Sequence, residues 1–179
     1  FPAMKEYIRY MNTWVDTDGI MFMQRPGNDG KILKWYNLGE WVAPGNLPPD
    51  EMVHTFYYWR CADITARVAK VLNDYGDFMR YSELAERARR AFHNRFYNEQ
   101  DGTYGKAGGN IFALKMGVPE DRVAKVVRAL KQDIKDNKGH LDTGIFGTQF
   151  FFEVLAENGM QDLAYEAMNK KEEPGYGRW

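Results

Sequence analysis

A carboxylate stands beside two indoles in one short segment of the sequence. Glu40 directly precedes Trp41, Trp35 lies just upstream, and Gly39 and Pro44 break any regular element. An indole face stacks on the C–H face of a sugar ring, and a nearby carboxylate can hydrogen-bond the hydroxyls or move a proton. The segment therefore predicts a carbohydrate site. In the alternative reading, which stays open, the indoles are amphipathic plugs over a helix bundle and Glu40 is solvated.

Three roles are open for Glu40. It is the in-chain candidate for a catalytic acid, because burial against Trp41 would favour its protonated form. It can also bind sugar hydroxyls, or it can make local structural hydrogen bonds. Trp41 is the first candidate for a sugar contact and Trp35 the second. Trp14 and Trp59 lie in helical stripes and are expected in the core.

The three histidines do not form a metal-ligand pattern. None stands one helical turn from another, and the single cysteine, Cys61, has no cysteine partner. A transition-metal site is therefore not expected, and no cofactor is expected either. His140 begins a turn, where it either orients the chain or contacts ligand. His54 is a candidate for the mouth of a cleft, and His93, in a charged helix, is expected to be solvated.

Two glycines, Gly144 and Gly147, follow His140 at the predicted start of a helix. A residue without a Cβ lets two backbones approach closely. These glycines are therefore predicted to let the helix start approach a neighbouring segment.

Composition bounds the possible partners. The chain has 179 residues, 44% of them hydrophobic, and a formal net charge of −1. This balance offers no cationic field for nucleic acid or an anionic membrane, so neither partner is expected. Cys61, on a helical pattern, is expected to be a small buried hydrophobe. The compartment stays open, with a periplasmic or secreted location favoured over the cytoplasm.

The hydrophobic periodicity is helical almost throughout, which predicts a mostly α fold in one unit of residues 1–179. A turn-rich excursion near residues 20–35 is expected to form a short β-like hairpin. Helices are expected over the ranges 4–15, 49–73, 77–96, 110–116, 119–139, 145–158 and 161–171.

Three blocks of the sequence resemble the bacterial α-L-rhamnosidase family. The first is Gly39-Glu40-Trp41 with Pro44, followed by DEMVHTFYY at 50–58. The second is GHLDTGIFGT at 139–148. The third comprises Asn-Gly, Asp-Leu-Ala-Tyr and Pro-Gly-Tyr-Gly, in that order, within 158–177. The blocks follow the family's order at about its spacing, and they depart from it at Glu40, where the family usually has Asp.

The resemblance implies a part of an (α/α)6 toroid and an inverting glycoside hydrolase that acts on terminal α-L-rhamnosyl residues. It also implies that the general acid lies upstream of Phe1 and the general base just beyond Trp179. The chain is therefore expected to be an internal slice of a catalytic domain, one that supplies part of the sugar cleft and is inactive alone. The expected partner is a rhamnosyl glycan or glycoside, and exposed apolar helix faces could cause self-association.

Two other functions stay open at this stage. One is a non-catalytic helical module that binds a glycan or a protein. The other is a toroid glycosidase for another sugar, because neighbouring families share the fold. Residues that flank the chain in the parent gene would distinguish them.

Overall fold

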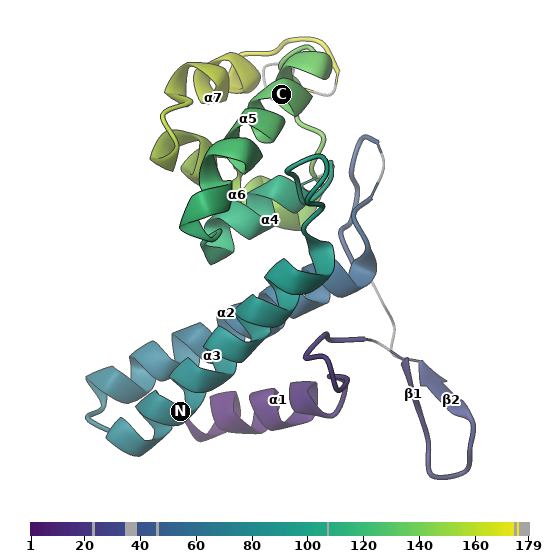
Figure 1. Cartoon of the computed structure of the whole chain (residues 1–179), viewed down its shortest axis with the longest axis vertical. Helices are drawn as coiled ribbons and strands as arrows, with labels where there is room; N and C mark the ends of the chain where they lie inside the picture. The colour runs from purple at the N-terminus through teal and green to yellow at the C-terminus, as the bar shows by residue number, and fades with distance from the viewer. Residues whose placement is uncertain (23, 35–38, 46, 107, 174, 176–179) are drawn as a thin grey trace. The chain divides into compact units, whose positions relative to one another are not determined.

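The computed structural model describes residues 1–22, 24–34, 39–45, 47–106, 108–173 and 175. This part of the chain is mostly helical, as the sequence predicts (Figure 1). In chain order its elements are α1 (Pro2–Asn12), β1 (Gln24–Pro26), β2 (Ile32–Lys34), α2 (Asp50–Val71), α3 (Tyr75–Phe96), α4 (Gly109–Met116), α5 (Glu120–Asp136), α6 (Ile145–Glu157) and α7 (Gln161–Met168).

The chain divides into two compact units. Unit 1 comprises Phe1–Gly39 and Pro49–Phe96, and unit 2 comprises Glu40–Pro48 and Tyr97–Trp179. Unit 1 therefore holds α1 to α3 with the β hairpin, and unit 2 holds α4 to α7 with the Glu40–Pro48 segment. The expectation that residues 1–179 form one domain stays a prediction.

Unit 1 is built on a hairpin of two long helices, α2 and α3, which run side by side (Figure 1). The turn between them depends on Asn73, whose φ of 58° is left-handed. Asparagine tolerates this conformation better than most residues do. The backbone N–H of Asp74 then donates to the carbonyl of Ala69 at 2.9 Å, which closes the end of α2.

The first helix, α1, packs on this hairpin. Pro2 occupies its first turn, where a missing N–H costs no helical hydrogen bond. Its buried side chains, Ile8 and Met11, belong to a core that also contains Tyr58 and Tyr81. The following segment is held by one buried hydrogen bond, from the backbone N–H of Met21 to the Thr55 hydroxyl at 3.0 Å.

The expected hairpin near residues 20–35 is present. β1 and β2 pair antiparallel, with Gln24 opposite Lys34 and Pro26 opposite Ile32. Gly30 has a φ of 77° in the connecting turn, a conformation that glycine adopts without steric cost.

Unit 2 is centred on α6, which contacts both α4 and α7, while α4 also contacts α5. Its core consists of large side chains with almost no exposed surface, including Phe112, Val126, Phe150, Phe151, Val154 and Leu155. The helix α6 is apolar on most of its circumference and is therefore a buried element. Its N-terminal backbone N–H groups therefore need hydrogen-bond partners inside the protein.

Several single-residue predictions can be compared with the packing of unit 1. Trp14 is buried and Trp59 packs against the same core, as expected. Cys61 is half-buried against that core, and burial raises the pKa of its thiol. The prediction for His93 was wrong, because its side chain is only 3% exposed. It lies eight positions after the buried Ala85, on the same helical stripe.

Among the described residues, we find no helix with the length and apolar character that a membrane span requires.

Candidate functional site

The carboxylate of Glu40 is completely buried and is bound to backbone N–H groups. Its side chain is 0% exposed. One oxygen, Oε1, accepts hydrogen bonds from the N–H of Phe146 at 2.8 Å and of Trp41 at 3.1 Å. The other, Oε2, accepts one from the N–H of Gly147 at 2.7 Å. Both oxygens are therefore engaged with main chain of the same unit.

These contacts cap the start of α6. The first helical residue, Ile145, donates its N–H to the carbonyl of Trp41 at 2.8 Å. Together with the two bonds to Glu40, this satisfies the N–H groups of the first three helical positions, which have no partner inside the helix. A negative charge is also favourable at this end of the helix dipole. Glu40 and Trp41 therefore act as a cap supplied from a distant segment.

The close approach requires glycine at two positions. A Cβ on Gly144 would lie 2.2 Å from the carbonyl oxygen of Trp41 and 2.6 Å from Oε1 of Glu40. A Cβ on Gly147 would lie 3.0 Å from Oε2 of Glu40. The predicted role of these glycines, to let a helix start approach a neighbouring backbone, is confirmed.

A hydroxyl pair supports the same turn. The hydroxyls of Thr143 and Thr148 lie 2.8 Å apart and share a hydrogen bond. Thr143 is buried, and its methyl and Cβ lie against the position that a Cβ on Gly147 would occupy. The start of α6 is therefore tightly packed on this side.

The side chain of Trp41 lies on the outside of this cap. It is 53% exposed, and the side chain of Ile145, whose N–H binds the Trp41 carbonyl, is also exposed. The next residue, Val42, has a φ of 58°, which is rare for a β-branched residue. A fixed backbone thus presents an exposed indole, and an exposed indole can stack on a sugar ring.

Burial and hydrogen bonding act in opposite directions on Glu40. Burial raises the pKa of its carboxyl above the ordinary value, although the backbone N–H groups of Phe146, Trp41 and Gly147 act to lower it. All three donors point at its oxygens, which favours the ionised form against the effect of burial. Of the three roles open for Glu40, the described contacts favour local structural hydrogen bonding.

The remaining predicted site residues fall in different places. His140 lies in the turn between α5 and α6, where its backbone carbonyl accepts from the Asn137 side-chain amide at 2.9 Å; a role of its side chain in orienting the turn stays a prediction. Its contact with ligand stays a prediction. Trp35 lies outside the described residues. Among those described, no group of three or more His, Cys, Asp or Glu is placed to hold a metal ion.

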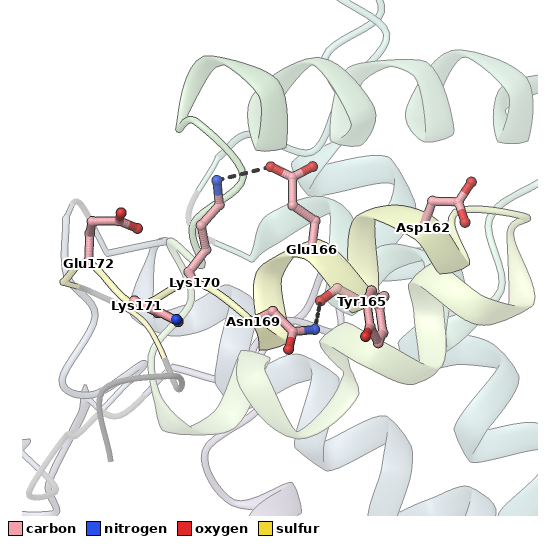
Figure 2. A pocket seen from close by; sticks show the side chains of 7 residues that line it. All are labelled: Asp162, Tyr165, Glu166, Asn169, Lys170, Lys171 and Glu172. Carbon is pink, nitrogen blue, oxygen red and sulfur yellow. Dashed lines mark hydrogen bonds and ion pairs between the residues drawn. The ribbon is translucent and has the colours of Figure 1, made fainter.

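A separate hollow of about 450 Å³ lies along α7 and the residues that follow it (Figure 2). Its polar groups bind one another: Lys170 pairs with Glu166 at 3.0 Å, and the Asn169 amide donates to the Tyr165 carbonyl at 2.8 Å. None of the predicted sugar contacts lines this hollow. The candidate site therefore stays at the cap of α6.

A comparison with known families decides the wider assignment. The model for the bacterial alpha-L-rhamnosidase six-hairpin glycosidase domain matches residues 1–179. The chain belongs to this family. The match confirms the resemblance found in the sequence and fits the predicted part of a helical toroid.

Curated relatives agree with the family assignment. An alpha-L-rhamnosidase of Streptomyces avermitilis is 28% identical over 182 residues, covering 98% of this chain and 16% of the relative. An alpha-L-rhamnosidase of Formosa agariphila is 28% identical over 189 residues, covering 97% of this chain and 18% of the relative. The chain thus spans less than a fifth of the length of these two relatives.

Solved structures of the family share the fold of this chain. The alpha-L-rhamnosidase from Dictyoglumus thermophilum matches with a TM-score of 0.82 and 29% identity, covering 98% of this chain and 20% of that one. The alpha-L-rhamnosidase of S. avermitilis, complexed with L-rhamnose, matches with a TM-score of 0.84 and 26% identity, covering 99% and 16%.

Proposed function

We propose that the protein that carries this chain hydrolyses terminal α-L-rhamnosyl residues, and that the chain supplies one wall of the sugar cleft. Family membership over residues 1–179 supports the reaction class. The observation that carries the role of this chain is the exposed indole of Trp41 on a backbone that is bonded to α6. The match to a relative complexed with L-rhamnose favours this sugar over others.

The proposed reaction inverts the configuration at the anomeric carbon. One carboxyl group protonates the glycosidic oxygen as its bond to the sugar breaks. A second takes a proton from the water that attacks from the opposite face, and the two carboxyl groups stand roughly 6.5–9.5 Å apart to admit that water. The products are the free alcohol and β-L-rhamnose.

Within this scheme the chain binds and orients the sugar. Trp41 stacks on the C–H face of the ring, and Trp35 and His140 are further proposed contacts. Glu40 faces main-chain N–H groups, so its geometry does not suit a proton donor to the substrate. We therefore assign the acid and the base to residues outside 1–179, as the family resemblance implies.

Hydrolysis of a panel of 4-nitrophenyl glycosides tests the proposal. The longer protein should cleave the α-L-rhamnoside in preference to glycosides of other sugars, and NMR should detect β-L-rhamnose first. The 179-residue chain alone should release no 4-nitrophenol. Preference for another sugar, first release of the α-anomer, or activity of the isolated chain would contradict the respective part of the proposal.

The isolated chain is also expected to self-associate. At the end of the α2–α3 hairpin the large apolar side chains of Val71, Leu72, Tyr75 and Met79 are exposed. Clustered apolar surface favours association. Sedimentation at increasing concentration should show a rising mass, and Leu72→Ser with Met79→Ser should lower it. A monomer at all concentrations would contradict this expectation.

A further inference from the structure

The carboxylate of Glu40 binds the backbone of Trp41 and of the first turn of α6. We infer that Glu40 is a positioning residue: it locks the main chain of Trp41 against the start of α6, fixes the indole in the sugar cleft, and transfers no proton to the substrate. The inference rests on the proposed function for the sugar contact of Trp41. It concerns Glu40 itself, for which the sequence alone left three roles open.

The hydrogen bonds and the complete burial of Glu40 both oppose proton donation to a substrate. Oε1 faces two N–H donors and Oε2 faces a third, at 2.7–3.1 Å. Both acceptor directions of Oε1 are occupied by N–H groups, so a proton on Oε1 would point toward another hydrogen atom, and Oε2 already accepts from Gly147. A general acid must also come within about 3 Å of the oxygen that it protonates. A side chain with no exposed surface cannot make that contact.

The position of the indole follows from the same bonds. The N–H of Trp41 donates to Oε1 of Glu40, and the carbonyl of Trp41 accepts from the N–H of Ile145. Both polar groups of the Trp41 backbone are therefore fixed, while its side chain remains exposed. The left-handed conformation of Val42 persists because the preceding residues are held. Loss of the carboxylate should release the indole.

The chain offers further support in the two glycines. Any side chain at Gly144 would displace the Trp41 carbonyl, and one at Gly147 would press on Oε2 of Glu40. The helix start is thus shaped to receive this carboxylate. A merely solvated glutamate would need no such space.

A double-mutant cycle in the longer protein tests whether Glu40 acts through Trp41. The variants are Glu40→Gln, Trp41→Ala and the double variant, and the readouts are kcat and KM on two rhamnosides and the inhibition constant of free L-rhamnose. Glutamine keeps the shape but places an N–H donor opposite a backbone N–H. Loss of one charge-assisted bond should raise KM and the inhibition constant about tenfold. In the Trp41→Ala background the same change should raise them less than about twofold, because the indole is already absent.

The two substrates separate positioning from acid catalysis. The 4-nitrophenyl rhamnoside has a good leaving group that needs little protonation, whereas methyl α-L-rhamnoside needs a proton donor. A positioning role predicts equal effects on both substrates, with kcat changed less than about threefold. A large loss of kcat on the methyl glycoside alone would show that Glu40 is the acid and overturn the inference. Additive effects of Glu40→Gln and Trp41→Ala would overturn it too.

Two control variants and one measurement of amide exchange distinguish loss of the anchor from other effects of the substitution. Glu153→Gln removes an ion-paired carboxylate from the exposed side of α6 and should leave all constants unchanged. Glu40→Asp retains the charge and should recover most of the affinity. Amide exchange at residues 145–148 should accelerate at least about tenfold in Glu40→Gln, with or without activity. Unchanged exchange would refute the anchor, whereas a wild type without rhamnosidase activity would refute only the proposed function.

Discussion

The side-chain oxygen of Glu40 lies 2.7 Å from the backbone nitrogen of Gly147, a residue 107 positions further along the chain. This bond joins the Glu40–Pro48 segment to the first turn of α6. It is one of three bonds by which the segment 40–41 caps that helix. The exposed indole of Trp41 is therefore attached to a buried helix, although it lies in a loop.

The closeness of Gly144 to this cap predicts a large effect of one methyl group. Gly144→Ala would place a Cβ 2.2 Å from the Trp41 carbonyl, so the loop or the helix must shift. We expect a loss of about 2–3 kcal/mol in the free energy of unfolding, measured by urea denaturation. Gly45→Ala, which meets no atom within 4 Å, is the matched control and should change it by less than about 0.5 kcal/mol. Equal effects of the two would contradict the close packing.

A buried amide holds together the loop before α4. The Oδ1 of Asn110 accepts from the Thr103 hydroxyl and from the Tyr104 N–H, each at 2.9 Å, and its Nδ2 donates to Asp133 at 3.3 Å. Asn110→Ala would remove these three hydrogen bonds, at a cost of about 2–3 kcal/mol in unfolding free energy.

The matched control for that change is Asn169→Ala. Asn169 is exposed, and its side-chain amide donates to the carbonyl of Tyr165. Its loss should cost about 0.5–1 kcal/mol. A cost for Asn110→Ala no larger than for this control would show that the buried network contributes little.

The half-buried imidazole of His54 predicts a pH dependence of stability. Burial lowers its pKa below 6.5, although the charges of Asp50 and Glu51 raise it, and among the described residues its Nδ1 has no hydrogen-bond partner. Between pH 6.5 and the lower folded-state value, the unfolded chain binds more protons than the folded chain. The contribution of His54 to stability is therefore present above pH 6.5 and is lost as the pH falls.

Urea denaturation of the wild type and His54→Gln at pH 7.5 and 5.5 measures this contribution. The fall in unfolding free energy between the two pH values should be smaller in the variant. An identical fall in both proteins would contradict the assignment to His54.

Local patterns of the sequence predict most of the secondary structure. The expected start of the fourth helix at Asn110 differs by one residue from the observed start of α4 at Gly109. The apolar stripes, the left-handed turn residues and the short hairpin all act over a few positions, so they can be read from neighbouring residues. The misjudged His93 shows the limit, because charged neighbours along α3 masked its place on the buried stripe.

Local sequence patterns predict the residues of the candidate site but not the contact between them. The sequence marks Glu40 and Trp41 as chemically unusual, and it marks Gly144 and Gly147 as a point of close approach. It does not state that these two features meet, because the contact spans more than a hundred residues. The burial of Glu40, which decides among its roles, follows from that contact and from no local pattern.

The affinity of the longer protein for L-rhamnose, with and without the indole of Trp41, shows whether this chain contacts the sugar. Titration followed by calorimetry should give a dissociation constant about tenfold higher for Trp41→Ala, which corresponds to about 1.4 kcal/mol. Thermal stability should change little, because the side chain is half exposed. Tyr165→Ala, which removes another exposed aromatic of unit 2, should bind L-rhamnose as the wild type does. Equal affinity of Trp41→Ala and the wild type would contradict the proposal that this chain forms a wall of the sugar cleft.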